Sequence, residues 1–273
     1  MLKIREKCPQ NGKIARKYSR KERKMIYFDT FSVYPLLNFN QIQTSAAMLP
    51  AELAHRALRS EDNEERARHL GGYILLERLV KKYEGGFKSA VEGIVKPEFG
   101  SFFDRRGILP CVRYDSYGKP YFEDHDNLAF NISHSAHMAA CAISIAEDGT
   151  DIANAVGIDV QLISNNIKQA KRMVEGYFND AEKAKIAAYE DNDANYCRVF
   201  TEIWTKKEAL LKCLGVGLSC IELADTENPE ACGCRFVATE EREISYVDLD
   251  GKEATEKYCL TVCEQISTAA TPI

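Results

Sequence analysis

The distribution of hydrophobic residues along the chain predicts a mixture of strands and helices. Short apolar or alternating runs are typical of strands. Strands are therefore expected at residues 25–34, 128–133, 138–145, 156–160, 235–238, 244–249 and 258–263. Apolar residues that recur every three or four positions are typical of helices. Helices are therefore expected at 60–83, ending at Gly85-Gly86, and at 200–212, ending at Gly215.

Local signals add two helix starts and one boundary. Pro50 suits the start of a helix, because its ring fixes φ and no backbone N–H is needed there. Asn179 and Glu182 have the spacing of a capping box, in which each side chain binds the backbone N–H of the other residue. Asp148-Gly149 predicts a turn, and residues 148–154 are the expected boundary between two halves of the chain.

Two of the predicted elements carry polar residues on one face. In the strand that begins at residue 156, Asp159 and Gln161 are two positions apart and therefore point to the same side. At about 100° per residue, the helix at 200–212 has one polar stripe, formed by Thr201, Thr205, Glu208 and Lys212. A carboxylate one turn from an ammonium suits a metal ion together with a phosphate. The same spacing also occurs in ordinary exposed Glu–Lys pairs, and the pattern alone leaves both interpretations open.

The composition is that of an ordinary globular protein. Of the 273 residues, 45% are hydrophobic and 28% are charged, which is enough apolar material for a sizeable core. No run of 18 apolar residues is present, so a membrane-spanning helix is not expected. The basic start lacks the apolar segment of a secretory leader, and the ten cysteines are then expected to stay reduced. We therefore expect a cytoplasmic location and no membrane partner.

The first 24 residues form a basic segment. They contain ten Lys or Arg and two Glu, whereas the whole chain has a formal net charge of −5. Such a segment is typical of a solvated, flexible tail. Two alternatives stay open, namely an electrostatic arm for an acidic partner and a true start at Met25, where the first strand pattern begins. No nucleic-acid-binding module is recognisable, so nucleic acid is not an expected partner.

The cysteines raise the alternative of a zinc site. Cys232-Gly233-Cys234, together with Cys259 and Cys263, could supply four thiolates. Their spacing does not contain the C-x-x-C pair of common zinc sites, and Cys259 and Cys263 fall on a predicted strand. We therefore expect buried thiols at these positions, with zinc as the alternative.

Four ordered blocks of sequence resemble the 4′-phosphopantetheinyl transferases. The chain has V-G-I-D-V-Q at 156–161 and, after about forty residues, W-T-K-K-E-A-L-L-K at 204–212, which is similar to the signature of that family. Upstream, G-K-P at 118–120 and F-N-I-S-H-S at 130–135 are similar to two further blocks of the family, in the same order. In addition to these four blocks, R-A-R-H-L-G-G at 66–72 is similar to the family's Arg-containing helix.

The resemblance implies the fold and its division. It covers roughly residues 50–220 and fits the long, two-half, surfactin-synthetase-activator-like (Sfp-type) subfamily. The implied fold class is α+β, with a pseudo-two-fold arrangement of two similar α+β halves in a monomer. The expected division is a basic tail at 1–24, an N-terminal half at 25–150, and a C-terminal half at 151–273 that carries the metal-binding motifs.

The resemblance also implies an activity. Members of the family transfer the 4′-phosphopantetheine group of coenzyme A to a serine hydroxyl of a carrier protein and release adenosine 3′,5′-bisphosphate. The expected enzyme is a magnesium-dependent transferase of the holo-[acyl-carrier-protein] synthase type, with manganese as an alternative ion. Its partner would be an apo acyl, aryl or peptidyl carrier protein. The alternative is a catalytically weak homologue that binds coenzyme A or a partner protein without transfer.

The matching motif positions imply roles for individual residues. The implied metal ligands are Asp159, Gln161 and Glu208, and the implied catalytic residues are Glu208, Lys212 and Asp159. The implied coenzyme A contacts are Arg68, Lys119, Ser133, His134 and Lys207.

Gln161 and the Ser133-His134 pair each bear on the expected function. Many members of the family have Glu where this chain has Gln161, so the site would carry one negative charge fewer. A Ser–His hydrolase is not expected, because Ser133 and His134 are adjacent and their side chains diverge on an extended segment.

Overall fold

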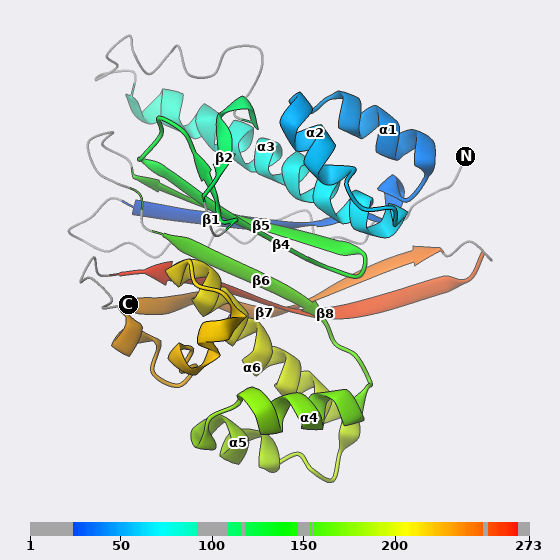
Figure 1. The fold of residues 1–273 in the computed structure, drawn as a ribbon, viewed down its shortest axis with the longest axis vertical. Helices are drawn as coiled ribbons and strands as arrows, with labels where there is room; N and C mark the ends of the chain where they lie inside the picture. The colour runs from blue at the N-terminus through cyan, green and yellow to red at the C-terminus, as the bar shows by residue number, and fades with distance from the viewer. Residues whose placement is uncertain are drawn as a thin grey trace. The chain divides into compact units, whose positions relative to one another are not determined.

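The computed structural model describes residues 24–91, 109–115, 118–146, 153, 155–247 and 251–266, with the backbone alone at 24 and 83–91. Within these ranges the chain divides into two compact units, one ending at Ala153 and the other continuing from Ala155 (Figure 1). The division falls in the segment where the sequence predicts a boundary. The predicted tail lies outside the described residues, except for the backbone of Lys24.

The N-terminal unit is built on a three-stranded antiparallel sheet. Its strands are β1 (Lys24–Ser32), β4 (Leu128–Ser135) and β5 (Met138–Ala146), in the order β1-β5-β4. The helices α1 (Phe39–Ala47), α2 (Ala51–Ala57) and α3 (Asn63–Val91) lie on one side of the sheet (Figure 1). A separate hairpin consists of β2 (Val112–Tyr114) and β3 (Pro120–Phe122), and short 3₁₀ turns occupy Tyr34–Leu36 and Leu109–Cys111.

The helix α3 packs closely on all three strands of this sheet. A Cβ atom at Gly71 would come within 2.6 Å of Val33 Cγ1, and one at Gly72 within 2.7 Å of Ile132 Cγ2. A methyl group at either position would therefore require the facing side chain to move. The strand β5 is buried along its whole length, which makes it the centre of an apolar core.

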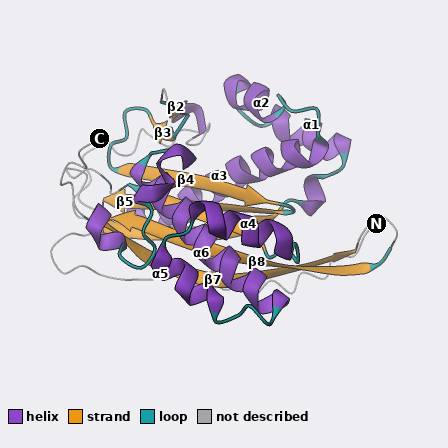
Figure 2. Cartoon of the chain, turned by 60° about the horizontal axis from the view of Figure 1, so that its bottom comes forward, coloured by secondary structure: helices purple, strands orange, loops and turns teal. Residues whose placement is uncertain are grey.

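The C-terminal unit has its own three-stranded antiparallel sheet. Its strands are β6 (Val156–Leu162), β7 (Cys234–Val247) and β8 (Glu253–Gln265), in the order β6-β8-β7. Its helices are α4 (Ile167–Tyr177), α5 (Asp180–Ala187) and α6 (Asp193–Leu214), with 3₁₀ turns at Leu218–Leu223 and Pro229–Cys232. The three helices lie on one side of β7 and β8, and α6 is the helix that packs directly on the strands (Figure 2).

The two units have the same connectivity. In each three-stranded sheet, the first strand leads to helices and, in the N-terminal unit after the β2–β3 hairpin, to two consecutive strands, the last of which takes the central position. In each, the longest helix packs on that sheet. The predicted α+β class is therefore confirmed, and the two halves are similar in topology, as the resemblance implies.

Several predicted elements are confirmed in detail. The capping box of Asn179 and Glu182 is present, with both reciprocal bonds formed. Pro50 precedes α2, and α6 ends at Gly215, whose φ of 76° is readily adopted only by glycine. Among the described residues, no helix is long and apolar enough to cross a membrane.

Two predicted boundaries are wrong. The helix α3 does not end at Gly85-Gly86 but continues to Val91, because glycine weakens a helix without blocking its hydrogen bonds. The predicted segments 235–238 and 244–249 are not two strands, because residues 235–247 belong to the single strand β7, and residues 248–249 lie outside the described ranges. The charged residues between them alternate in exposure along an edge strand, so their polarity does not interrupt the pairing with β8.

Candidate active site

A glycine brings β6 against α6. A Cβ atom at Gly157 would come within 2.5 Å of Cys213 N and still closer to Ala209 O, so only glycine fits between this strand and the helix backbone. Because alternate residues of a strand share a face, Asp159 and Gln161 point to the same side as Gly157. The predicted strand is thus confirmed, and its polar face is directed towards α6.

Asp159 meets Lys212 at this interface. The Asp159 side chain is 6% exposed, and its Oδ1 accepts a hydrogen bond from Lys212 Nζ at 2.6 Å. Lys212 is 28% exposed, so the ammonium reaches from the buried carboxylate towards solvent. A charge-assisted bond of this kind holds both groups in defined positions.

Glu208 lies close enough to both groups to interact electrostatically. Burial raises the pKa of the Glu208 carboxyl, the negative charge of Asp159 raises it further, and Lys212 acts in the opposite direction. Two carboxylates therefore repel each other beside one ammonium. A cation placed between them would lower that repulsion.

The polar stripe of α6 faces the sheet rather than water. Thr201 and Thr205 are buried, and Thr205 Oγ1 lies 3.1 Å from Thr261 Oγ1 on β8. Glu208 is half-buried, and Lys212 pairs with Asp159 across the interface. The alternative of an ordinary exposed Glu–Lys pair therefore does not describe this stripe.

The donor set of this interface fits a hard divalent cation. Magnesium binds oxygen ligands, usually one or two carboxylates together with substrate phosphates. Asp159 and Glu208 supply such carboxylates, and Gln161 is half-buried on the same strand face, where its amide oxygen is a neutral donor. The structure thus brings Asp159 and Glu208 close together and places Gln161 on the same strand face as Asp159.

Lys207 has contacts that the sequence did not indicate. Its Nζ lies 2.8 Å from Glu182 Oε2, with the two side chains 2% and 0% exposed, and donates to Ala224 O at 2.7 Å. Thr226 donates to the other oxygen of Glu182. Lys207 thereby ties α6 to α5 and to the segment around Ala224. Its assignment to coenzyme A stays a prediction, and these contacts do not favour it.

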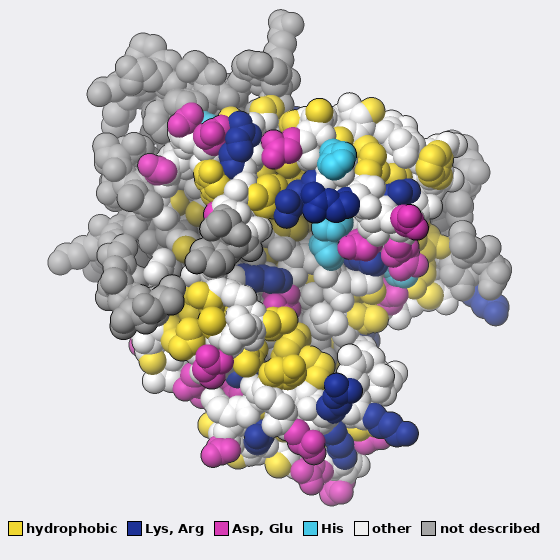
Figure 3. Space-filling view, viewed as in Figure 1, with side chains coloured by type: hydrophobic (Ala, Val, Ile, Leu, Met, Phe, Trp, Pro, Cys, Tyr) yellow, Lys and Arg dark blue, Asp and Glu magenta, His cyan; other side chains and the backbone are white. Residues whose placement is uncertain are grey.

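The N-terminal unit gathers basic side chains beside the β4–β5 hairpin. Ser133 is buried and His134 half-buried on β4, and the His134 ring meets the ring of His69 edge-on, with centroids 5.0 Å apart. Arg68 Nη1 donates to Ala136 O in the hairpin turn at 3.4 Å. Figure 3 shows Arg, Lys and His side chains grouped on the surface of this unit.

His69 is a member of this group that the sequence analysis missed. Burial lowers the pKa of His69, and Arg56 lowers it as well, whereas Glu65 raises it. The position of His69 directly after Arg68 was the signal, because both lie on the helix segment that resembles the family's Arg-containing helix.

Lys119 lies in the turn of the β2–β3 hairpin. Its backbone N donates to Asp115 Oδ1 at 2.8 Å, and its O accepts from Asp115 N at 3.0 Å. Gly118 has a φ of 83°, which explains the glycine before the lysine. The turn therefore fixes the backbone from which the Lys119 side chain extends.

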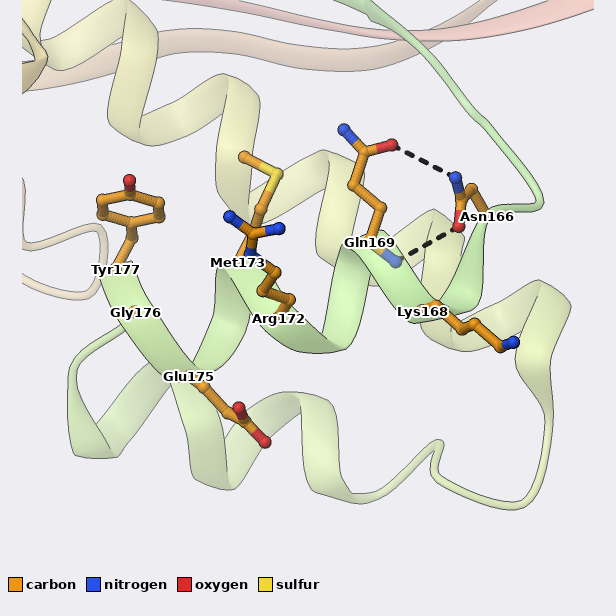
Figure 4. A pocket seen from close by; sticks show the side chains of 8 residues that line it. All are labelled: Asn166, Lys168, Gln169, Arg172, Met173, Glu175, Gly176 and Tyr177. Atoms are coloured by element: carbon orange, nitrogen blue, oxygen red, sulfur yellow. Dashed lines mark hydrogen bonds between the residues drawn. The ribbon is translucent and has the colours of Figure 1, made fainter.

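An open pocket lies along α4, whose side chains line it (Figure 4). The helix begins at the cap Asn166, whose side chain accepts from Gln169 N at 3.2 Å. The pocket combines cationic side chains with the apolar surface of Met173 and of Tyr177, which is 49% exposed. Its lining residues are Asn166, Lys168, Gln169, Arg172, Met173, Glu175, Gly176 and Tyr177. Such a mixed surface suits a macromolecular partner.

Comparisons with known proteins agree with this geometry. Residues 155–263 match the family model of the 4′-phosphopantetheinyl transferase superfamily. The chain is 28% identical over 186 residues to the 4′-phosphopantetheinyl transferase HetI of Nostoc sp., and the alignment covers 67% of this chain and 66% of that protein. It is 32% identical over 175 residues to a 4′-phosphopantetheinyl transferase of Bacillus subtilis, with 63% of each chain covered. The chain thus spans slightly less than two thirds of the length of these relatives.

Proposed function

The chain belongs, through residues 155–263, to the 4′-phosphopantetheinyl transferase superfamily, and on this premise we propose that it transfers 4′-phosphopantetheine from coenzyme A to a carrier protein. The serine oxygen of the carrier forms a bond to the β-phosphorus of coenzyme A. The bond from that phosphorus to the bridging oxygen breaks, and adenosine 3′,5′-bisphosphate leaves. The observation that carries the proposal is the meeting of Asp159, Glu208 and Lys212 at the β6–α6 interface.

We assign the metal to the same interface. Asp159 and Glu208 would hold a magnesium or manganese ion, with Gln161 as a neutral oxygen donor. The bound ion would neutralise charge on the pyrophosphate. Because two carboxylates rather than three are available, the protein contributes less negative charge to the ion than a relative with Glu in place of Gln161.

The remaining chemistry falls to the chain's own side chains. The bond from Lys212 to Asp159 fixes the ammonium, which extends to the half-exposed side of the interface and can approach a phosphate oxygen. Glu208 is the carboxylate whose pKa is raised by burial and by Asp159. A raised pKa brings a carboxylate closer to the range in which it accepts a proton effectively. We therefore assign to Glu208 the proton that the serine hydroxyl releases.

In this proposal, four residues of the N-terminal unit contact coenzyme A. Lys119, Ser133, His134 and Arg68 would bind its phosphates and nucleotide through charge-assisted hydrogen bonds. The pocket along α4 would receive the carrier protein. The helix α4 directly follows β6, the strand that carries Asp159 and Gln161.

The proposal extends to an Sfp-type, monomeric, cytoplasmic enzyme.

The experiment that tests this function is transfer to an apo carrier protein. The full chain is incubated with coenzyme A, magnesium and the apo carrier, and the intact mass of the carrier is measured. We expect the mass to rise by one phosphopantetheine group, and Glu208→Gln to abolish the rise. Binding of coenzyme A without any mass change, over a panel of acyl and peptidyl carriers, would favour the weak homologue and contradict the proposal.

A further inference from the structure

Three buried cysteines meet at one end of the C-terminal sheet. Cys213 comes from the last turn of α6, Cys234 from the start of β7 and Cys263 from β8. Their sulfur atoms all lie within 4.8 Å of one another, and Cys213 Sγ and Cys234 Sγ are 3.9 Å apart. The three residues are 1%, 0% and 0% exposed. The proposed transfer reaction uses none of these thiols.

Regular elements rather than loops fix the positions of these sulfurs. Cys263 stands directly opposite Gly157 in the pairing of β6 with β8. Cys213 lies against the same glycine, because a Cβ atom there would meet Cys213 N at 2.5 Å. Cys234 pairs with Gln265 at the first position of β7. The cluster is therefore built by strand register and by the close approach of β6 and α6.

We propose that Cys213, Cys234 and Cys263 bind one thiophilic d¹⁰ metal ion, Zn(II) or Cu(I). Thiolate ligands select these soft or borderline ions over magnesium. Three sulfurs placed about 2.3 Å from one ion are separated by roughly 4 Å, which agrees with the distance between Cys213 and Cys234. The carbonyl oxygen of Ala155, which accepts from Cys213 Sγ at 3.4 Å, is adjacent to the same cluster.

The rival states of the cluster fit the geometry less well. A disulfide has a sulfur–sulfur distance of about 2.05 Å, so two thiols would have to move together inside a packed core. Without an ion, hydrogen bonding with Cys213 and Cys234, together with burial, raises the pKa of Cys263 and keeps this thiol neutral. A bound ion would take the place of the thiol protons and would compensate the buried negative charge.

The proposal is independent of the transferase activity and revises the zinc alternative drawn from the sequence. That alternative combined Cys232, Cys234, Cys259 and Cys263. The structure instead recruits Cys213 from the helix that carries Glu208 and Lys212, and among the described cysteines it leaves Cys259 outside the group. An ion here would fasten the last turn of α6 to the sheet beside the candidate active site.

Cadmium provides a direct test, because its charge-transfer absorption in the ultraviolet arises from thiolate ligands and not from carboxylates. The full reduced chain is titrated with Cd(II) in excess magnesium, which occupies oxygen-ligand sites. We expect saturation at one equivalent. Cys213→Ala and Cys263→Ala should each weaken Cd(II) binding by about 100-fold or more, since loss of a direct ligand should exceed the effect of an outer contact. Cys259→Ala, a buried cysteine on the same strand, is the matched control and should bind as the wild type does.

A second measurement on the wild type covers the case in which a cluster variant does not fold. X-ray absorption of the chain loaded with Zn(II), or separately with Cu(I), reports the ligand atoms. We expect three sulfur neighbours for at least one of these ions. The sample that shows three sulfur neighbours, loaded with Zn(II) or with Cu(I), identifies the metal. The absence of the cadmium absorption in wild type, an equal loss in Cys259→Ala, or a coordination shell of oxygen and nitrogen alone for both ions would overturn the proposal.

Discussion

The two units share one connectivity but differ in the layer between helix and sheet. In the N-terminal unit, α3 packs on β5, which is buried and apolar throughout apart from Ser144, and two helical glycines allow the close approach. In the C-terminal unit the glycine is on the strand instead, at Gly157, and the helix brings Glu208 and Lys212 to Asp159.

This difference agrees with the proposed location of the active site in the C-terminal unit. Charged groups in a helix–sheet interface cost free energy of desolvation, which an apolar interface does not incur. The ion pair of Asp159 and Lys212 offsets part of that cost, but the repulsion between Asp159 and Glu208 adds to it. An arrangement that weakens the fold in this way is typical of a functional site. The N-terminal unit keeps its charged candidates at a hairpin and a turn, outside the apolar layer.

The largest expected effect is a difference between a variant at Asp159 on β6 and one at Asp29 on β1, the first strands of the two units. Asp159→Asn keeps the size of the side chain but removes a charge from the proposed metal site. We expect the transfer rate to fall by about 10²–10³-fold, because stabilisation of the pyrophosphate charge is lost. Asp29→Asn, on the corresponding strand β1, is the matched control, since Asp29 Oδ1 accepts a local hydrogen bond from Thr30 N and belongs to no proposed site. Equal losses in both variants would remove the distinction between the units.

The second effect compares the glycines. Gly157→Ala places a methyl group against the backbone of α6, which cannot yield as a side chain can, and we expect a loss of about 3 kcal/mol in the free energy of unfolding. Gly72→Ala meets only the Ile132 side chain and gains helix propensity worth about 1 kcal/mol, so its net effect should be much smaller. Urea denaturation of both variants measures the difference. A Gly157→Ala protein as stable as wild type would contradict the described packing of β6 on α6.

The third effect tests the nucleotide role of the N-terminal unit. His134→Ala and Lys119→Ala should each raise the KM for coenzyme A by roughly 10–100-fold, which corresponds to the loss of one charge-assisted hydrogen bond of about 1.5–3 kcal/mol. The kcat should change much less, because these contacts lie away from the attacked phosphorus in the proposed reaction. Steady-state kinetics at saturating carrier and magnesium provide both constants. An unchanged KM in both variants would remove these residues from the site.

The smallest effect is a pH dependence of stability in the metal-free chain. The pKa of Glu208 is raised in the folded state by burial and by Asp159, so ionisation of this group disfavours folding. The wild type should therefore lose stability relative to Glu208→Gln as the pH rises from the ordinary glutamate pKa through the raised value, and the two should agree below that window.

Thermal unfolding in the presence of a chelator measures this course. Glu77→Gln on α3, which removes a carboxylate paired with Lys81 at 2.8 Å, controls for the change in net charge. With magnesium present, the wild type should instead be more stable than Glu208→Gln, because the ion favours the ionised carboxyl. If the stability difference between the wild type and Glu208→Gln were the same at every pH, the assigned interaction of Glu208 with Asp159 would be contradicted.

The sequence predicts the elements of the site better than their surroundings. The period-two pattern around Asp159 and the stripe of Thr205, Glu208 and Lys212 are local signals, and both elements form as expected. The stripe was expected opposite an apolar face, yet α6 is covered by the sheet on one side and by α4 and α5 on another. A helical wheel cannot show which neighbour covers each side.

The features that the sequence did not reveal depend on long-range contacts. The partner of Lys207 is Glu182 on the preceding helix, α5, and no local sequence pattern links the two residues. Cys213 joins Cys234 and Cys263 only because β8 runs through the centre of the sheet and α6 ends beside it. Strand pairing and helix packing fix such contacts, whereas spacing along the chain does not.

The central claim is that the C-terminal unit holds a divalent ion between Asp159 and Glu208. Manganese binding, followed by electron paramagnetic resonance at saturating coenzyme A, tests it directly because the signal of the free ion is lost on binding. We predict one bound ion in the wild type and in His134→Ala, and an affinity at least about 10-fold lower in Glu208→Gln. Undiminished manganese binding by Glu208→Gln would contradict the claim.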